Sequence, residues 1–144
     1  MDTSAILKVL EIYYEAFAEK DANRRCELLA GCLTPDAEIW GHSQVFTGYT
    51  AISEKIAGFQ SNFPGCHLAL GRGLFTFEKI VRLANAIVRL DGFVVANGET
   101  VMEVAPDGRF CRVVPLWEMS LPPLPEAWPE HLAAPPAPKV SNAT

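Results

Sequence analysis

Length, composition and charge describe one acidic domain. The 144 residues are 49% hydrophobic and 20% charged, with a formal net charge of −5, which is enough chain for one sizeable core. The acidic balance argues against a nucleic-acid partner, and no apolar stretch approaches the roughly 18 residues that a membrane span needs. The N-terminal segment lacks the uninterrupted apolar centre of a signal peptide, because its apolar pattern contains Lys8, Glu11 and Glu15. We therefore expect a cytoplasmic protein that does not contact a membrane.

The start of the chain has the pattern of two helices. Apolar residues recur at helical spacing over residues 4–20, where Thr3 or Ser4 can cap the helix. Asp21 can cap a second helix. That helix should end at Thr34-Pro35, because the residue before a proline is pushed out of the helical region.

A short strand and a third helix should follow. The strand is predicted over residues 36–41, and Thr50 is the candidate cap of the helix. Pro64-Gly65 should stop that helix. It is predicted from four apolar residues at helical spacing, Ile52, Ile56, Phe59 and Phe63.

The pattern changes to long strands after Cys66. Asp91-Gly92 and Asp107-Gly108 favour hairpin turns, and Asn97-Gly98 marks either a further turn or a bulge. The runs between them are rich in branched and aromatic residues. Four antiparallel strands are predicted, over residues 67–77, 79–90, 93–104 and 109–120.

These strands are apolar on both faces, whereas an antiparallel sheet with one wet face alternates apolar and polar residues. Three helices can cover only one face of such a sheet. The sequence therefore predicts a homodimer that packs through the outer sheet face.

The C-terminal segment has a different composition. Seven of the eleven prolines lie after Met119, which excludes a helix or a central strand there. We expect one domain over residues 1–121 and a proline-rich arm over residues 122–144, whose end should be disordered.

No motif for a metal or an organic cofactor is present. The cysteines form no CxxC pair and are expected to be reduced thiols. Gly71-Arg72-Gly73 lacks the helix that should follow a phosphate-binding loop. We expect no cofactor.

The order of elements resembles the nuclear-transport-factor-2-like superfamily, in particular its SnoaL-like and ketosteroid-isomerase-like branch. Four short motifs carry the resemblance across most of the chain, between about Ile6 and Glu118. They are the 13–17 stretch YYEAF, the 34–37 stretch TPDA, Phe46-x-Gly48, and the 107–110 hairpin DGRF with Trp117 beyond it. The resemblance implies an α+β fold. The implied fold is a cone-shaped, curved antiparallel sheet that packs on three helices and encloses a pocket. This fold is also called a cystatin-like roll.

The superfamily includes isomerases, polyketide cyclases, dehydratases, epoxide hydrolases and pure binders, so the fold does not fix the function. The place of the ketosteroid isomerases' catalytic carboxylate falls at Gly41 in this chain, which argues against their mechanism. Tyr13 lies where the family has its helix-one tyrosine. Trp117 falls where the family lines its pocket, and Glu103 is the nearest acidic residue to the second donor position.

His42 is the candidate catalytic base, because imidazole titrates near neutral pH, but it also fits a solvent-facing loop. Tyr13 is the candidate hydrogen-bond donor to a substrate oxygen, and Tyr14 is the adjacent alternative. Either phenol can instead be an ordinary core residue.

Further candidates would line the pocket. Trp40 is one of these candidates and shares a strand face with Glu38. We expect Glu38 itself to lie at a solvated edge of the sheet. Arg82 can bind an acidic or carbonyl group if its strand face lines the cavity, or can form a surface ion pair. Phe59 and Val113 are wall or core residues, which sequence alone does not separate.

Three functions are compatible with these residues. The first is a small-molecule-binding, cofactor-free isomerase, cyclase or dehydratase that acts on a hydrophobic carbonyl compound by proton transfer. The second is a non-catalytic ligand binder, and the third is a dimeric interaction module of the same fold.

Overall fold

The structure is a computed structural model that describes residues 2–118 and residue 131. The predicted arm over residues 122–144 lies outside the described residues, except for His131. The elements are α1 (Thr3–Ala18), α2 (Ala22–Cys32), β1 (Leu33–Trp40), β2 (Val45–Thr47), α3 (Tyr49–Asn62), β3 (Cys66–Phe77), β4 (Ile80–Arg89), β5 (Val94–Val104) and β6 (Phe110–Trp117).

The helices begin at residues that satisfy their first N–H groups. Asp21 caps α2 as predicted, since its side chain accepts from the backbone N–H of Asn23 at 3.0 Å. The predicted cap of α1 is wrong, because Asp2 accepts from the N–H of Ser4. The predicted cap of α3 is also wrong: Gly48, at φ +85°, precedes the helix and no side chain caps it.

The sheet has six strands in the order β2-β1-β6-β5-β4-β3. Neighbouring strands are antiparallel except β1 and β6, which pair in parallel, so the sheet is mixed. The first strand begins at Leu33, earlier than predicted, and passes through Pro35 where its pairing with β6 shifts register. The three-residue edge strand β2 was not predicted, because it is too short to show a pattern.

The long hairpins follow their predicted turns. Gly92 and Gly108 adopt φ values of +87° and +90°, which glycine tolerates without strain. Asn97-Gly98 lies inside β5 and forms no turn, and the register with β4 shifts just before it, between Ile87 and Val88.

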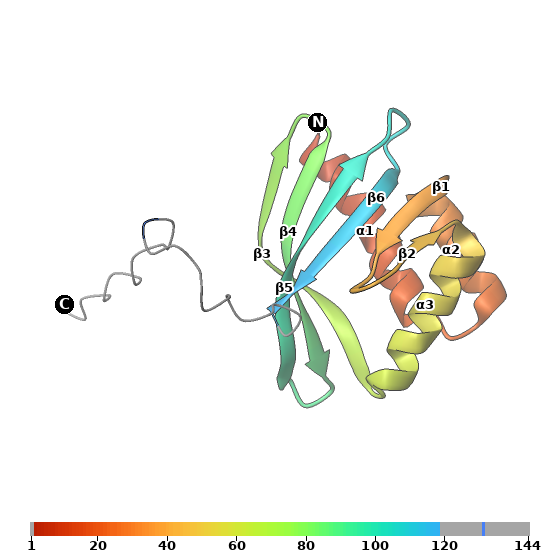
Figure 1. The fold of residues 1–144 in the computed structure, drawn as a ribbon, viewed down its shortest axis with the longest axis vertical. Helices are drawn as coiled ribbons and strands as arrows, with labels where there is room; N and C mark the ends of the chain where they lie inside the picture. The colour runs from red at the N-terminus through yellow and green to blue at the C-terminus, as the bar shows by residue number, and fades with distance from the viewer. Residues whose placement is uncertain (1, 119–130, 132–144) are drawn as a thin grey trace.

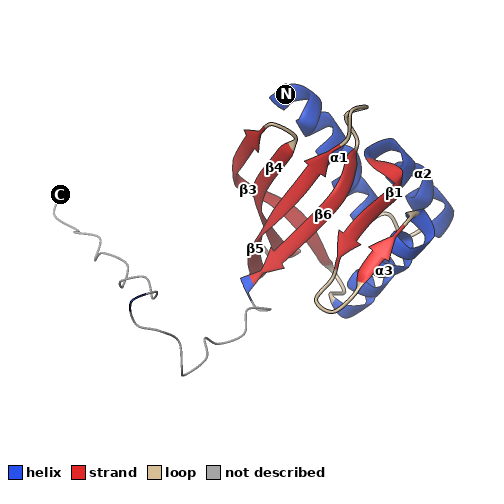
Figure 2. Ribbon diagram, turned by 45° about the horizontal axis from the view of Figure 1, so that its top comes forward, coloured by secondary structure: helices blue, strands red, loops and turns tan. Residues whose placement is uncertain are grey.

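The three helices lie against one face of the curved sheet, and the opposite face is uncovered (Figures 1 and 2). The core fills the space between the two layers and includes Leu10, Leu29, Ile56, Leu83 and Phe110, each 1% exposed or less. The fold class is therefore α+β with a curved, open sheet, as predicted.

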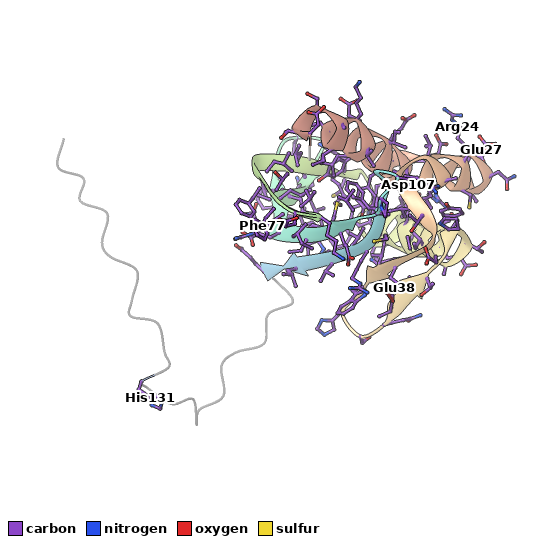
Figure 3. All side chains as sticks on the ribbon, turned by 90° about the horizontal axis from the view of Figure 1, so that it is seen from above. Arg24, Glu27, Glu38, Phe77, Asp107 and His131 are labelled. Carbon is purple, nitrogen blue, oxygen red and sulfur yellow. The ribbon has the colours of Figure 1, made fainter. Side chains whose placement is uncertain are left out.

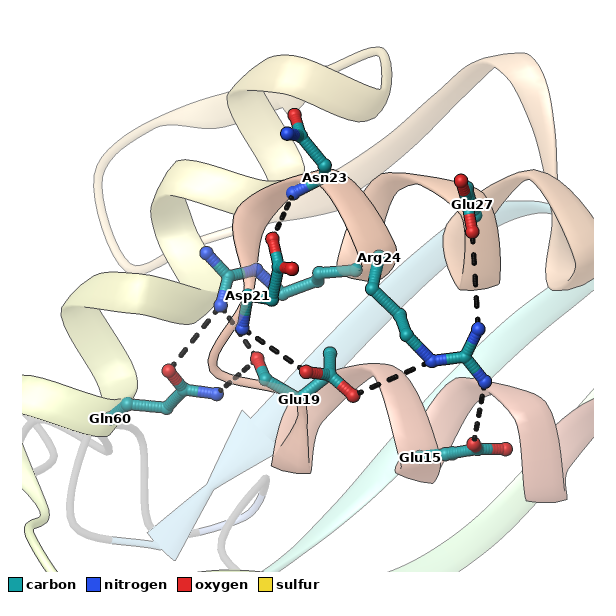
Figure 4. A network of polar contacts seen from close by, with 8 residues as sticks. Glu15, Glu19, Asp21, Asn23, Arg24, Glu27 and Gln60 are labelled. Carbon is teal, nitrogen blue, oxygen red and sulfur yellow. Dashed lines mark hydrogen bonds and ion pairs between the residues drawn. The ribbon is translucent and has the colours of Figure 1, made fainter.

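A buried arginine joins the three helices. Arg25 of α2 donates to the Ser53 hydroxyl of α3 at 2.9 Å and to the carbonyl of Glu19, just beyond α1, at 2.7 Å. Gln60 of α3 donates to the same carbonyl at 2.9 Å (Figure 4). A cation near the last carbonyls of a helix is favourable. Through these hydrogen bonds, Arg25 holds the end of α1 against α2 and α3.

The DGRF hairpin, one of the motifs that carry the resemblance, connects β5 to β6 and contacts the junction of α2 and β1. Arg109 donates to the carbonyl oxygens of Ala30 at 3.0 Å and Leu33 at 3.3 Å, where α2 passes into β1. Asp107 holds that guanidinium, and hydrogen bonds from Arg109 keep the pKa of Asp107 below its usual range. The motif therefore has a structural role here.

Among the described residues, no helix combines the length and apolar composition that crossing a bilayer requires.

Candidate ligand-binding site

A largely enclosed cavity of about 50 Å³ lies between the helices and the inner face of the sheet. Its walls come from α1, α3 and every strand except β2. They consist of Tyr13, Tyr14, Phe17, Ile39, Lys55, Phe59, Leu68, Asn85, Thr100, Met102, Pro115 and Trp117. The cavity is therefore mostly apolar, with a few polar groups placed within it, as is typical of small-molecule sites.

Aromatic rings of α1 and α3 form one wall. The ring of Tyr13 packs at 5.0 Å from that of Phe17 and at 5.8 Å from that of Tyr14, between centroids. Phe17 in turn packs edge-on to Phe59 at 5.8 Å. These rings meet because Tyr13 and Phe17 are four residues apart and lie on the buried stripe of α1.

The two phenols are held neutral. Burial raises the pKa of Tyr13 well above its ordinary value, and the nearby Tyr14 adds to this. Burial alone raises the pKa of Tyr14 to about 12. Tyr49 donates its hydroxyl to the carbonyl of Leu33 at 2.8 Å, but neither cavity phenol has a hydrogen-bond partner among the described residues. Both therefore remain available as donors.

Asn85 and Thr100 add a polar pair to the sheet wall. The Asn85 amide donates to the Thr100 hydroxyl at 2.7 Å, and both residues are buried. The Asn85 Oδ1 has no partner among the described residues. A buried acceptor without a partner costs free energy, which a ligand donor or a water can recover.

A more open groove of about 420 Å³ adjoins the cavity. Lys55, Pro115 and Trp117 line both spaces, so the groove and the cavity meet at these side chains. The rest of the groove wall comes from Trp40, Gly41, His42, Val114 and Leu116. A ligand larger than the cavity could therefore extend along the groove.

The structure brings several predicted site residues together. Tyr13, Tyr14, Phe59 and Trp117 line the cavity. Trp40 and His42 line the groove, where His42 is exposed.

Two other candidates lie elsewhere. Arg82 is on the outer face of the sheet in an ion pair with Glu99 at 2.7 Å, because alternation along β4 turns its neighbours Val81 and Leu83 inward. Val113 is fully buried in the core and lines neither space.

The alternation of β1 determines which of its residues reach the site. Ile39 is buried and lines the cavity, whereas Glu38 lies 3.6 Å from Arg112 across the outer face. Figure 3 shows Glu38 on the side of the molecule away from Arg24 and Glu27 of α2. Glu38 therefore occupies the solvated edge, as expected.

Gly41, where the resemblance would place a catalytic carboxylate, lies in a tight turn. A Cβ at Gly41 would lie 3.0 Å from the Phe46 ring and 3.1 Å from the Gln44 carbonyl oxygen. A carboxylate could not stand at this position without moving its neighbours.

Sequence reasoning missed Asn85 and Lys55. Asn85 is the polar member of an inward-facing set that also holds Val81, Leu83 and Ile87, and this interruption was its only signal. Lys55 stands three residues after Ile52 and four before Phe59, so it belongs to the inward stripe of α3. A lysine within an apolar stripe was the signal in the sequence that could have identified Lys55 as a site residue.

No group of three or more His, Cys, Asp or Glu side chains within the described residues is placed to hold a metal ion. The four cysteines are free thiols, and burial raises the pKa of Cys32 to about 12.

A curved sheet wrapped around three helices, with a cavity between the layers, defines the nuclear-transport-factor-2-like fold. Solved structures of SnoaL-like and nuclear-transport-factor-2-like proteins match the chain closely enough to confirm this fold. No protein-family model and no curated protein matches the chain.

Three similar solved structures illustrate the relationship. A proposed SnoaL-like isomerase from Agrobacterium tumefaciens is 22% identical, with a TM-score of 0.73, over 81% of this chain and 99% of that one. A proposed SnoaL-like polyketide cyclase from Jannaschia sp. CCS1 is 16% identical, with a TM-score of 0.64, over 83% and 94%. A cystatin-like protein of unknown function from Methylobium petroleophilum PM1 is 15% identical, with a TM-score of 0.66, over 89% and 83%. At these identities the likeness establishes the fold.

Proposed function

We propose that the protein binds a small hydrophobic carbonyl compound in the cavity and the adjoining groove. The observation that supports this most strongly is the pair of neutral phenols, Tyr13 and Tyr14, on the wall of an apolar cavity. Neither has a hydrogen-bond partner in the described part of the chain. A buried phenol donates strongly to a carbonyl or enolate oxygen, because the surroundings do not screen the interaction. Trp117 supplies an apolar wall beside both spaces.

The size of the two spaces indicates how such a ligand would lie. A cavity of about 50 Å³ holds a carbonyl and one or two adjoining carbons, whereas pockets for drug-sized ligands are typically about 300–1,000 Å³. The groove of about 420 Å³ offers room for the rest of the molecule.

A panel of aryl ketones tests the binding function, each paired with the hydrocarbon that replaces the carbonyl by a methylene group. We expect the wild-type protein to bind ketones more tightly than their hydrocarbons. Tyr13→Phe and Tyr14→Phe should each reduce this preference by up to about fivefold, since one net hydrogen bond contributes about 1 kcal/mol. Equal binding of both compounds by all three proteins would rule out carbonyl recognition.

We further propose cofactor-free proton transfer next to the carbonyl, with His42 as the base. His42 is exposed in the groove, close in sequence to the cavity residue Ile39. Its imidazole could reach a ligand that extends from the cavity into the groove. Deuterium exchange at the carbons next to the carbonyl, followed by NMR in D₂O, measures such transfer without knowledge of the natural substrate.

A non-catalytic binder is the second candidate. Among the described residues, no Asp, Glu or His lines the cavity itself, which favours binding without turnover. Exchange that the protein accelerates and that His42→Ala abolishes supports catalysis. Ligand binding without acceleration supports the binder.

We also propose that the protein is a homodimer through the outer sheet face. Phe75, Phe77 and Leu116 are each at least 50% exposed on that face. Exposed apolar surface of this kind is typical of protein interfaces.

A further inference from the structure

We propose that the ligand carries a carboxylate next to its carbonyl group and that Lys55 binds this carboxylate where the cavity meets the groove. The proposal rests on the small-molecule function proposed above and narrows its ligand class to apolar keto acids.

The position of Lys55 is the first observation. The residue lies on the inward stripe of α3, between Ile52 and Phe59, and its side chain lines both spaces. Any molecule that enters the cavity from the groove therefore passes the Lys55 side chain.

The charge environment of Lys55 is the second observation. In the part of the chain that the structure describes, the ion pairs involve Arg24, Lys79, Arg82, Arg89, Arg109 and Arg112, and none involves Lys55. Its Nζ instead lies 5.5 Å from the centroid of the Phe46 ring. A cation–π contact favours the charged form of the lysine but leaves the ammonium hydrogens available for an anion.

Partial burial strengthens the argument. Desolvation lowers the pKa of Lys55 below that of an exposed lysine. Because the charged form is incompletely solvated, a carboxylate at this place would recover part of that lost solvation.

The chemical types of the polar groups point to one class of ligand. The site offers two phenols on the cavity wall and a lysine side chain where the cavity meets the groove. A carbonyl oxygen suits the phenols, and a carboxylate on a neighbouring carbon suits Lys55. The walls of Trp40, Pro115 and Trp117 then fit an apolar remainder that lies along the groove.

The alternative is that Lys55 only covers Phe46 with its methylene groups and binds no ligand. This alternative predicts that removal of the charge has the same small effect on the binding of anionic and neutral compounds.

The test uses the full chain and matched pairs of acids and primary amides with the same apolar body: phenylpyruvate, phenylacetate, 2-naphthylacetate and octanoate, each beside its amide. Calorimetry measures the dissociation constants for the wild type, Lys55→Met and Lys55→Arg. Lys8→Met, at an exposed lysine of α1, removes the same net charge away from the site. Circular dichroism checks that each variant is folded.

We expect the wild type to bind the acids about tenfold more tightly than their amides, phenylpyruvate most tightly of all, since hydrogen bonds to charged groups contribute about 1.5–3 kcal/mol. Lys55→Met should lose this preference and keep its affinity for the amides. Lys55→Arg and Lys8→Met should retain the preference.

Equal wild-type affinity for acids and amides would overturn the carboxylate proposal and leave the binding function intact. This comparison needs no variant, so it decides the question even if Lys55→Met does not fold. An acid preference that survives in Lys55→Met, or that Lys8→Met also loses, would likewise overturn it. Failure of every acid, amide and aryl ketone to bind would overturn the binding function as well.

Discussion

At the scale of single residues, the cavity has few polar groups, and their protonation and hydrogen bonding determine what it can bind. Tyr13 and Tyr14 present neutral hydroxyls, and Asn85 presents an acceptor that has no partner within residues 2–118. Tyr13 and Asn85 are buried and Tyr14 is half-buried. The buried Asn85 oxygen in particular has a raised cost of remaining without a hydrogen bond. A ligand with complementary groups would therefore gain both affinity and a defined orientation.

The raised phenol pKa values predict a loss of stability at alkaline pH. An unfolded tyrosine ionises near pH 10, whereas the pKa of folded Tyr14 is about 12. The folded state therefore holds more protons between these values, and the free energy of unfolding should fall by up to about 1.4 kcal/mol per pH unit for each such tyrosine. The contribution is complete below pH 10 and is lost as the pH rises toward 12.

Urea unfolding at several pH values between 9 and 12 measures this slope. Tyr14→Phe should have a shallower slope than the wild type, because it removes one ionisation. An identical slope in both proteins would show that Tyr14 ionises equally well in the folded state.

Gly98 positions Trp117 through its lack of a side chain. A Cβ at Gly98 would lie 2.7 Å from the Leu116 carbonyl oxygen and 2.8 Å from Cε3 of Trp117. Gly98→Ala should therefore destabilise the protein by about 1–3 kcal/mol and displace the Trp117 wall.

Gly58→Ala is the matched control, because Gly58 is within α3 and a Cβ there has no neighbour within 4 Å. It should stabilise the protein by about 0.5–1 kcal/mol through helix propensity. Thermal unfolding measures both variants. A stable Gly98→Ala protein would mean that β5 and β6 separate easily at the site.

At the scale of elements, the site depends on how the ends of the helices are held. The end of α1 is fixed by the side chains of Arg25 and Gln60, both of which donate to the Glu19 carbonyl. Because Tyr13, Tyr14 and Phe17 lie on the same helix, this junction also sets the aromatic wall of the cavity.

Arg25→Met should destabilise the protein by about 2–3 kcal/mol, because the Ser53 hydroxyl and the Glu19 carbonyl lose a charged, buried donor. Its neighbour Arg24 is the control. Arg24 is exposed, and its ion pairs with Glu15, Glu19 and Glu27 are 3.9 Å long. Arg24→Met should change the stability by less than about 0.5 kcal/mol. Denaturant unfolding compares the two, and equal effects would contradict the proposed role of the junction.

At the scale of the whole molecule, the uncovered sheet face is the main unexplained surface. Cross-strand register places Phe75, Arg82, Val101 and Val114 in one row across it. Apolar side chains therefore alternate with ion pairs such as Arg82–Glu99 on this face. A mixed surface of this kind suits an interface between two copies, in which the ion pairs fix the alignment.

Phe75→Glu should convert the proposed homodimer to a monomer. It would bury a carboxylate beside Arg82, which already pairs with Glu99. Leu90→Glu is the control, because Leu90 is 87% exposed in the turn between β4 and β5 and lies off that face. Analytical ultracentrifugation measures the mass of each protein. A wild type that remains monomeric at high concentration would rule out the dimer.

The sequence predicted the order and type of the main elements, because periodicity and turn residues are local signals. Asp21, Pro64-Gly65 and Asp107-Gly108 act as the sequence indicated. It did not predict the parallel contact of β1 with β6, which forms between segments far apart in the chain.

The site was only partly predictable. Tyr13 and Trp117 were suggested by the family resemblance, but Lys55 and Asn85 became visible only when α3 and β4 were placed around a common space. Arg82 was a site candidate because it shares a strand face with Ala84 and Ala86, whose small side chains would leave room for a ligand. That strand is apolar on both faces, so the pattern did not identify the face that turns inward.

The most direct test of the central claim is a crystal structure of the protein with the tightest-binding ketone or keto acid of the panels above. We predict that the ligand lies between α1, α3 and the inner sheet face, with its carbonyl oxygen about 2.6–3.2 Å from the hydroxyl of Tyr13 or Tyr14. A ligand bound only on the outer sheet face, with the cavity between Tyr13 and Trp117 left without it, would contradict the account.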